Sequence, residues 1–255
     1  MKISTFNINS IHARLPYFLN WLKKETPDIV LLQEIKTQYN DFPFFEINTS
    51  GYQACVLGQK GYNGVAVLTK EKATLKQENL PNFEDTQARY IEVLYRDIII
   101  SSVYMPNGNP VGTEKFEYKL KFMDAFYNHA KHLLVENQNI IFGGDFNVIM
   151  SPKDVYDEEP FKNNALCQKS VRNRLAALNF LGFYDAYRTL NPKQNGYTYW
   201  DYGPLAFAND LGMRIDYFYL SASMLEKLKN CAPDKKLRAQ EKPSDHTPLT
   251  AIFED

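Results

Sequence analysis

The chain has 255 residues, of which 44% are hydrophobic and 14% aromatic, so it can bury a sizeable core, and a disordered chain is excluded. Its 29 basic and 30 acidic residues give a net charge of −1, which excludes a globally positive binder of nucleic acid; any such binding must rest on local charge. Three cysteines without a CxxC pair argue against a disulfide framework and a structural zinc, and the lack of a membrane span or signal peptide predicts a cytoplasmic protein.

The N-terminal half alternates predicted strands with turns and one helix. Residues 2–6 are predicted as a short strand, 16–25 as a helix with Pro16 in its first turn, and 28–33 as a buried strand. Two hairpins are expected next, because strand-like runs flank short turn-rich segments. The paired runs are 53–57 with 65–69, and 89–94 with 98–104.

The C-terminal half repeats the same order of element types. Its longest predicted helix is 114–136, with Thr113 as the N-cap and apolar residues spaced three and four apart. Further predicted elements are a strand at 140–142, a helix at 170–181 and strands at 214–220 and 249–253. No Ser/Gly linker or charge block divides the halves, so we expect one domain over residues 1–255, in which two packed sheets are covered by helices.

Polar side chains follow the apolar runs in an unusual way. Five runs end in an acid, an amide or a histidine, whereas a buried strand ordinarily stops in glycine, proline or serine. Such tips could converge at one edge of a sheet and form the rim of an active site. The five tips are Asn7, Glu34, Asn147, Asp216 and His246.

Glu34 and Asn7 end neighbouring runs and together suggest a site for one hard cation. A carboxylate that leaves a buried strand is well positioned, and the carboxamide of Asn7 adds a neutral oxygen. Each residue also has an ordinary explanation: Glu34 as a solvated acid at a strand end and Asn7 as an Asx turn. Taken alone, neither residue decides between the two.

The segment from Gly143 to Asn147 is a stronger signal. Its glycines would let the backbone turn closely, and Asp145 and Asn147, two residues apart, would point to the same side of an extended chain. In such a pair the carboxylate can hold a water while the N–H of the carboxamide donates a hydrogen bond to a phosphoryl oxygen, as hydrolysis of a phosphoester requires. A simple tight turn would use the same residue types.

Asp216 and His246 are predicted to pair. Asp216 lies within an apolar run, where a buried carboxylate is costly unless it has a partner, and a histidine would be fixed in one tautomer by it. A surface pair between Asp216 and Arg214 is the alternative. His129 and His132, three residues apart on the long helix, are expected to be solvated.

With these residues assembled, the chain resembles exonuclease III and the apurinic/apyrimidinic endonucleases of the endonuclease/exonuclease/phosphatase superfamily. The resemblance covers nearly the whole chain, and the order of its motifs is specific. Gln59-Lys60-Gly61 and the run from Tyr104 to Asn107 are similar to the DNA-repair branch, as is Tyr199-Trp200. The other matching segments are 6–10, 27–36, 144–148, 214–217 and 241–246. The implied fold is an α/β (α+β) four-layer sandwich of two mixed β-sheets packed face to face and flanked by helices.

The resemblance also implies roles for particular residues. Glu34 would be the main Mg²⁺ or Mn²⁺ ligand, with Asn7 and Asp245 beside it, because oxygen ligands favour these ions over zinc. Asp145 would orient or deprotonate the attacking water, and Asn147 would hold a phosphate oxygen. Tyr104 and Asn107 would contact the scissile phosphate, while His246, oriented by Asp216, would donate to a phosphoryl oxygen.

Substrate recognition is expected at an apolar pocket and at local positive charge. Tyr199, Trp200, Met213 and Ile215 match the family's pocket for an extrahelical abasic sugar, and ordinary core packing is the alternative for each. Met213 departs from the larger aromatic ring or leucine of some relatives, and Asp210 would add negative charge near the DNA. Basic residues expected to contact DNA are Lys36, Lys60, Arg89, Lys115, Lys119 and Lys162, with Lys235, Lys236 and Arg238 more distant.

The resemblance therefore implies a monomeric, Mg²⁺-dependent nuclease of base excision repair that acts on duplex DNA. It would hydrolyse the phosphodiester 5′ to an abasic site and leave a 3′ hydroxyl, with accompanying 3′–5′ exonuclease and 3′ phosphatase or phosphodiesterase activity at 3′ ends. Two alternatives stay open at this point. One is a superfamily phosphatase for a soluble or lipid phosphoester, and the other is a non-catalytic DNA-binding relative, which would have lost a ligand.

Overall fold

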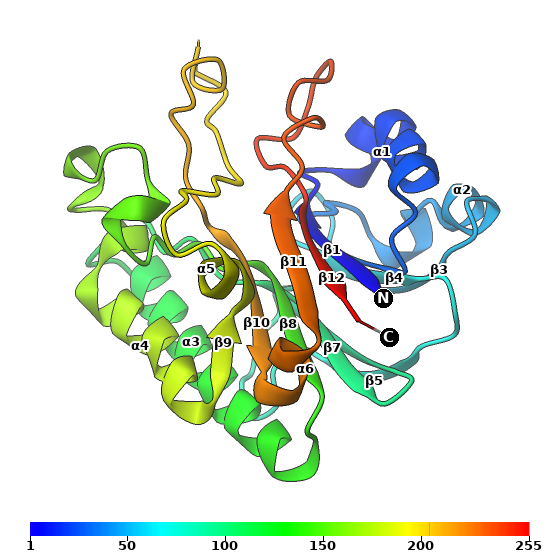
Figure 1. Cartoon of the computed structure of the whole chain (residues 1–255), viewed down its shortest axis with the longest axis horizontal. Coiled ribbons are helices and arrows are strands. Elements are labelled where there is room, and N and C mark those ends of the chain that lie inside the picture. Colours follow the sequence, from blue (N-terminus) through cyan, green and yellow to red (C-terminus); the bar gives the residue numbers. More distant parts are fainter. Residues whose placement is uncertain (204, 255) are drawn as a thin grey trace.

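A computed structural model describes residues 1–203 and 205–254 and shows two six-stranded β-sheets packed face to face (Figure 1). The first sheet has the strand order β11-β12-β1-β2-β4-β3. Only β1 and β2 run parallel in it, so the sheet is mixed as predicted. Its strands are β1 (Lys2–Asn7), β2 (Ile29–Gln33), β3 (Gln53–Leu57), β4 (Val65–Thr69), β11 (Leu228–Pro233) and β12 (Leu249–Phe253).

The second sheet repeats this plan, with the order β5-β6-β7-β8-β10-β9 and one parallel pair, β7 with β8. A parallel pair needs a long crossover, and α1 provides it in the first half and α3 in the second. The strands are β5 (Thr74–Glu78), β6 (Tyr90–Tyr95), β7 (Ile98–Tyr104), β8 (Ile140–Asp145), β9 (Phe183–Asp185) and β10 (Asp216–Ser221).

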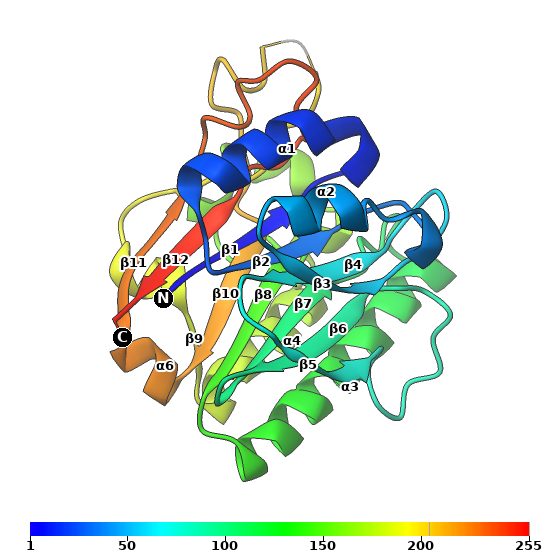
Figure 2. The ribbon, with the colours of Figure 1, turned by 90° about the vertical axis from the view of Figure 1, so that its right-hand side faces the viewer.

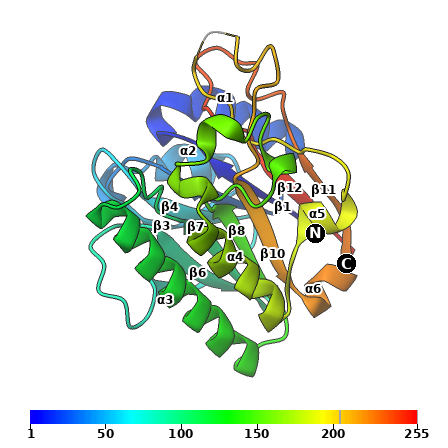
Figure 3. The same cartoon turned by 90° about the vertical axis from the view of Figure 1, so that its left-hand side faces the viewer.

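Helices cover the outer faces of both sheets and complete the four layers. The helices α1 and α2 lie on the first sheet (Figure 2), and α3 and α4 lie on the second (Figure 3). Their bounds are α1 (Ile11–Glu25), α2 (Phe44–Thr49), α3 (Glu114–Glu136), α4 (Lys169–Leu181), α5 (Ala186–Leu190) and α6 (Ala222–Glu226). Short 3₁₀ helices are η1 (Tyr39–Asp41), η2 (Pro152–Asp154), η3 (Glu159–Phe161) and η4 (Ala165–Cys167). No helix in the described ranges is long and apolar enough to cross a membrane.

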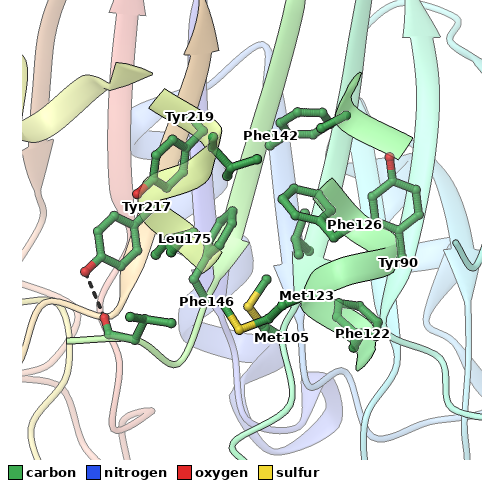
Figure 4. Close-up of a cluster of buried hydrophobic side chains, with 14 of the residues drawn as sticks. Tyr90, Met105, Phe122, Met123, Phe126, Phe142, Phe146, Leu175, Tyr217 and Tyr219 are labelled. Atoms are coloured by element: carbon green, nitrogen blue, oxygen red, sulfur yellow. Dashed lines mark hydrogen bonds between the residues drawn. The ribbon is translucent and has the colours of Figure 1, made fainter. Parts of the chain in front are cut away.

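Three apolar clusters fill the spaces between these layers. One lies between the two sheets and includes Leu31 and Ile141, another lies under α1 and α2, and the third lies between the second sheet and the helices α3 and α4. Figure 4 shows the third cluster, in which Phe146 packs among Phe126, Tyr217 and their neighbours. Because Phe146 is anchored in this core, its neighbours in sequence are carried at the end of a firmly held strand.

Two local predictions were wrong. The first helix begins at Ile11 and not at Pro16, because the side chain of Ser10 accepts a hydrogen bond from the amide of Ala13 and so caps an earlier turn. Gly143 and Gly144 do not make a turn; β8 continues through them to Asp145. A Cβ at Gly144 would overlap the carbonyl oxygen of Val103, so the glycines allow close packing of the strand.

Candidate active site

The predicted polar tips meet at one edge of the two packed sheets. The paired ends of β1 and β2 bring Asn7 beside Gln33, immediately before Glu34. In the second sheet the register places Asp145 opposite both Tyr104 and Asp216. The segments before β10 and β12 rise from this same edge, at the top of Figure 1. The five runs therefore deliver their polar ends to one place, as the sequence predicted.

A cavity of about 410 Å³ opens at this edge. Most of the predicted site residues line it: Glu34, Tyr104, Asn107, Asp145, Asn147, Tyr199, Met213, Ile215, Asp245 and His246. Asn7 and Asp216 are buried and support the lining from beneath. Lys60 is exposed on the loop between β3 and β4 and is not among the described residues that line the cavity.

Asp145 is the centre of the hydrogen-bond network. Its Oδ2 accepts from Nδ2 of Asn7 at 2.9 Å and from Nδ2 of Asn147 at 3.2 Å, and Nε2 of His246 lies 3.7 Å away. Burial raises the pKa of Asp145 to about 7, against the opposing charge of His246. A carboxylate with a pKa in this range can accept a proton from water near neutral pH.

The predicted pair of Asp216 with His246 is confirmed. Oδ2 of Asp216 lies 2.9 Å from Nδ1 of His246, and Asp216 is fully buried. Burial alone would lower the pKa of His246, but the carboxylates of Asp216 and Asp145 outweigh it and raise the pKa to about 10. The alternative partner, Arg214, binds Asp154 and Asp185 instead, at 2.7 and 2.8 Å.

Glu34 holds its carboxylate toward the cavity from a left-handed backbone position, with φ of 50°. Its Oε1 accepts from Nδ2 of Asn7 at 2.8 Å, and the ammonium of Lys36 lies 2.9 Å from Oε2. Burial would raise the pKa of Glu34, but Asn7 and Lys36 lower it below the usual value. A non-glycine residue in this conformation is uncommon and marks a site whose surroundings fix the backbone.

The carboxylate oxygens of Glu34 and Asp245 are suitable ligands for a hard divalent cation. Both carboxylates line the cavity, and Asn9 holds Asp245 through a 2.9 Å bond from Nδ2 to Oδ1. The Lys36 ammonium beside Glu34 shows that a positive group is accommodated there. Within 1–203 and 205–254, no group of three or more His, Cys, Asp or Glu residues is arranged so that it could hold a metal ion by itself. A sparse oxygen set fits Mg²⁺, which usually keeps several waters, better than it fits zinc.

Asn147 and Asn107 present adjacent carboxamides at the cavity. Nδ2 of Asn107 donates to Oδ1 of Asn147 at 3.1 Å, and Asn147 has a left-handed φ of 49°. The predicted contact between Asp145 and Asn147 is present, although Asn147 lies beyond the end of the strand. Tyr104 also lines the cavity, and the guanidinium of Arg89 lies 4.7 Å from the centre of its ring.

The apolar wall is formed by three of the four residues expected for it. Tyr199 forms isolated antiparallel β-bridges with Met213 and with His246. The centres of the Tyr199 and His246 rings lie 5.0 Å apart. Ile215 completes this wall. Trp200, however, is fully buried behind it, so this expected substrate contact was wrong.

Asp210, expected to add negative charge near the DNA, has two partners within the protein. Its Oδ1 accepts from Nε1 of Trp200 at 3.1 Å and lies 2.8 Å from the ammonium of Lys235. The carboxylate of Asp210 is thus compensated within the protein by Lys235.

Several lining residues were missed, because they come from irregular segments without a periodic signal. Part of the lining comes from the loop that contains η2, η3 and η4, whose side chains form a small apolar cluster with Met213 and Ile215. Hydrophobic residues in loops resemble ordinary core residues in a sequence. The missed lining residues are Asn109, Tyr156, Phe161, Asn164, Leu166, Asp201, Ala206 and Leu211.

Only some of the basic residues that were expected to contact DNA are exposed. Lys119 is fully buried and Arg238 nearly so, which makes both expected DNA contacts wrong. Lys36, Lys162 and Lys235 form ion pairs with acidic side chains, while Lys60 and Lys115 are exposed. The expectation of a solvated His129 was also wrong, because its Nε2 lies 2.8 Å from Glu92 in the core.

The chain matches the family model described as the endonuclease/exonuclease/phosphatase family over residues 4–246. It is 31% identical to exodeoxyribonuclease III of Haemophilus influenzae, over 99% of this chain and 100% of that protein. A Neisseria 3′ phosphatase bound to a product DNA hairpin superposes with a TM-score of 0.97 at 33% identity. An AP endonuclease of Archaeoglobus fulgidus superposes with a TM-score of 0.96, also at 33% identity. Both alignments cover 100% of each chain.

Proposed function

The chain belongs to the exonuclease III and AP endonuclease branch of the endonuclease/exonuclease/phosphatase family, and on that premise we propose that it repairs DNA by cleaving 5′ to abasic sites. The cleavage would leave a 3′ hydroxyl. Exonuclease and 3′-end-cleaning activities are proposed to share the same site, since its relatives carry these names. The substrate is duplex DNA with an abasic site or a 3′ end.

The main support for this proposal is the position of Asp145, which lines the cavity. Its carboxylate is held by Asn7 and Asn147 and has a pKa near 7, so it can orient a water and take its proton. The activated water would attack the phosphorus in line with the leaving 3′ oxygen of the neighbouring nucleotide. The proton would pass from water to an Oδ atom of Asp145 as the new P–O bond forms and the bond between phosphorus and the 3′ oxygen breaks. The departing oxygen would take up a proton from solvent to become the 3′ hydroxyl.

The phosphate is proposed to be held by donors on both sides of Asp145. The carboxamides of Asn147 and Asn107 and the protonated imidazole of His246 all line the cavity and can donate to phosphoryl oxygens. Tyr104 would contact the scissile phosphate through its hydroxyl, which stays protonated because burial raises its pKa. Donors fixed before the reaction stabilise the negative charge that develops in the transition state.

Glu34 and Asp245, with Asn7 beside them, would hold Mg²⁺ or Mn²⁺. A bound divalent ion supplies charge neutralisation on the phosphate, which is the chemistry that this branch of phosphoester hydrolases requires. Asn7 contributes by fixing the orientation of the Glu34 carboxylate through its 2.8 Å bond.

Recognition of the lesion is proposed to rest on the apolar wall. Tyr199, Met213 and Ile215 would pack against the exposed sugar of an abasic site, which lacks the base that would otherwise collide with the wall. Lys60, exposed on the loop between β3 and β4, would bind the DNA backbone electrostatically. We further propose a monomer that acts in the cytoplasm, with residues 1–255 as one functional domain.

The test is incubation of a duplex that carries one tetrahydrofuran abasic analogue and blocked 3′ ends. With Mg²⁺ we expect a single incision 5′ to the analogue, with no incision in EDTA or by the Glu34→Ala and His246→Ala variants. An uncut analogue in every metal condition would refute abasic endonuclease activity. Digestion that occurs only when 3′ ends are unblocked would assign the chain to exonuclease or 3′-end processing.

A further inference from the structure

Lys119 is a fully buried lysine that no step above uses. It lies in α3, whose other buried residues are mostly apolar, and its side chain has no exposed surface. Burying an ammonium is costly unless the group makes strong hydrogen bonds. The position of Lys119 therefore calls for a specific partner.

Its partners are the backbones of the two loops that carry the phosphate-binding amides. The Nζ atom donates to the carbonyl oxygen of Asn147 at 2.6 Å and to that of Asn107 at 3.1 Å. These loops leave different strands, β8 and β7, and both residues lie outside regular structure. One ammonium thus fixes the separation of the two loops beneath the cavity.

Two features of the loops depend on this contact. Gly108 follows Asn107 and has a φ of 83°, and a Cβ there would lie 2.6 Å from Cδ of Lys119, so the loop is packed directly on the lysine stem. Asn147 has the uncommon left-handed backbone conformation, and Lys119 binds its carbonyl. A strained residue keeps its conformation only when its surroundings determine it.

The charge of Lys119 also lies close enough to the reaction centre to be felt there. Burial lowers the pKa of Lys119 to about 7, and the carboxylate of Asp145 opposes that shift. In either protonation state the nitrogen retains at least two N–H donors for the two carbonyls. The hydrogen-bond anchor does not require the charge.

We propose that Lys119 is a positioning residue of the nuclease, which sets the spacing and orientation of the Asn107 and Asn147 carboxamides for the transition state. This inference rests on the proposed function. Since Lys119 does not reach the surface, it would act on the rate of cleavage and not on the affinity for DNA.

The test compares Lys119→Met with Lys119→Gln and with Lys121→Met on the exposed side of the same helix. Glutamine matches methionine in length, one atom shorter than lysine, but keeps an N–H donor. The substrate is the duplex described above. For Lys119→Met we expect kcat at least tenfold lower, KM within threefold of wild type and an unfolding temperature that is not lower. The Gln variant should recover several-fold in kcat, and Lys121→Met should stay within twofold.

Lys119→Met that cleaves within twofold of wild type would overturn the proposal, as would a loss seen only in KM. Should Lys119→Met fail to fold, Gly108→Ala provides the second test, because its new methyl group would push the loop off the lysine stem. It should lower kcat at least tenfold with KM unchanged, and an unaltered kcat would overturn the proposal. Wild-type protein that cuts no DNA would refute the proposed function itself.

Discussion

At the sheet edge, the charge state of a buried side chain depends on the charged partner beside it. Asp216 is fully buried, and its pairing with His246 over 2.9 Å is what keeps a charged imidazole in the site. The imidazole in turn lies 3.7 Å from Asp145. The two acids and the histidine form one coupled set, so a change in one should alter the others.

Replacement of Asp216 by Asn should lower the rate of DNA cleavage by roughly a hundredfold or more, because His246 would lose the group that fixes its orientation and charge. Steady-state cleavage of the abasic duplex measures this, with Asp41→Asn on the exposed turn η1 as the control. Cleavage by the Asp216 variant at the wild-type rate would show that the pair is structural only.

The same pair predicts a pH dependence of stability in metal-free protein. The pKa of His246 is raised from 6.5 to about 10, so its protonation stabilises the fold fully below pH 6.5, and this contribution is lost as the pH rises toward 10. Each unit by which Asp216 raises that pKa corresponds to about 1.4 kcal/mol. Urea unfolding of wild type and Asp216→Asn should therefore show a difference in free energy that shrinks between pH 6.5 and 10. A constant difference would contradict the assignment.

Among the elements, β8 positions the site most directly. Its last residue is Asp145, and Phe146 fixes the strand end by packing into the core under α3 (Figure 4). The alternation of side chains along the strand then turns Asp145 away from this core and toward the cavity, which Asn147 also lines from its left-handed position beyond the strand end.

The variant Phe146→Ala should lose about 3–5 kcal/mol of unfolding free energy, the usual cost of removing a fully buried phenyl group. Phe180→Ala is the matched control, since Phe180 is 92% exposed and its removal should change the free energy by less than about 0.5 kcal/mol. Chemical denaturation gives both values. Equal losses for the two variants would show that the strand end is not anchored as described.

Elements with strong periodicity could be predicted from the sequence, and α3 and most central strands have the predicted bounds within a few residues. The edge strands β5 and β11 could not, because half-exposed polar segments such as 74–78 carry no alternation. The start of α1 depended on a cap by Ser10, which competed with the more conspicuous signal of Pro16.

Site residues that follow the end of a strand could be predicted from the sequence. Residues that line the cavity from irregular loops could not. Glu34, Asp145 and His246 lie where chain order alone indicated. Trp200 was assigned to the wall because its neighbour Tyr199 lies there, yet adjacent residues in an extended segment point to opposite sides. The loop residues Tyr156 and Leu166 could be placed only by the tertiary fold.

At the scale of the whole molecule, two similar halves bring their strand ends to one edge, and the protein has no overall positive charge to attract DNA. The affinity for duplex DNA should therefore rest on a few phosphate contacts. The logarithm of the binding constant should fall linearly with the logarithm of salt concentration, by about 0.9 for each contacted phosphate.

Fluorescence anisotropy measures that slope. Lys60→Ala should reduce it by about one contact, and Lys76→Ala on the edge strand β5 should leave it unchanged. A salt-independent affinity would contradict electrostatic binding altogether.

We propose that Asp145 performs the chemistry of cleavage, and its carboxylate accepts hydrogen bonds from Asn7 of the first sheet and from Asn147 beyond the end of β8. The most direct measurement is the single-turnover cleavage rate of Asp145→Asn on the 3′-blocked abasic duplex, together with its dissociation constant for that duplex. We expect a rate at least about a thousandfold lower, because the variant loses a positioned general base, and a dissociation constant within threefold of wild type. Cleavage by the variant at a rate near that of wild type would contradict it.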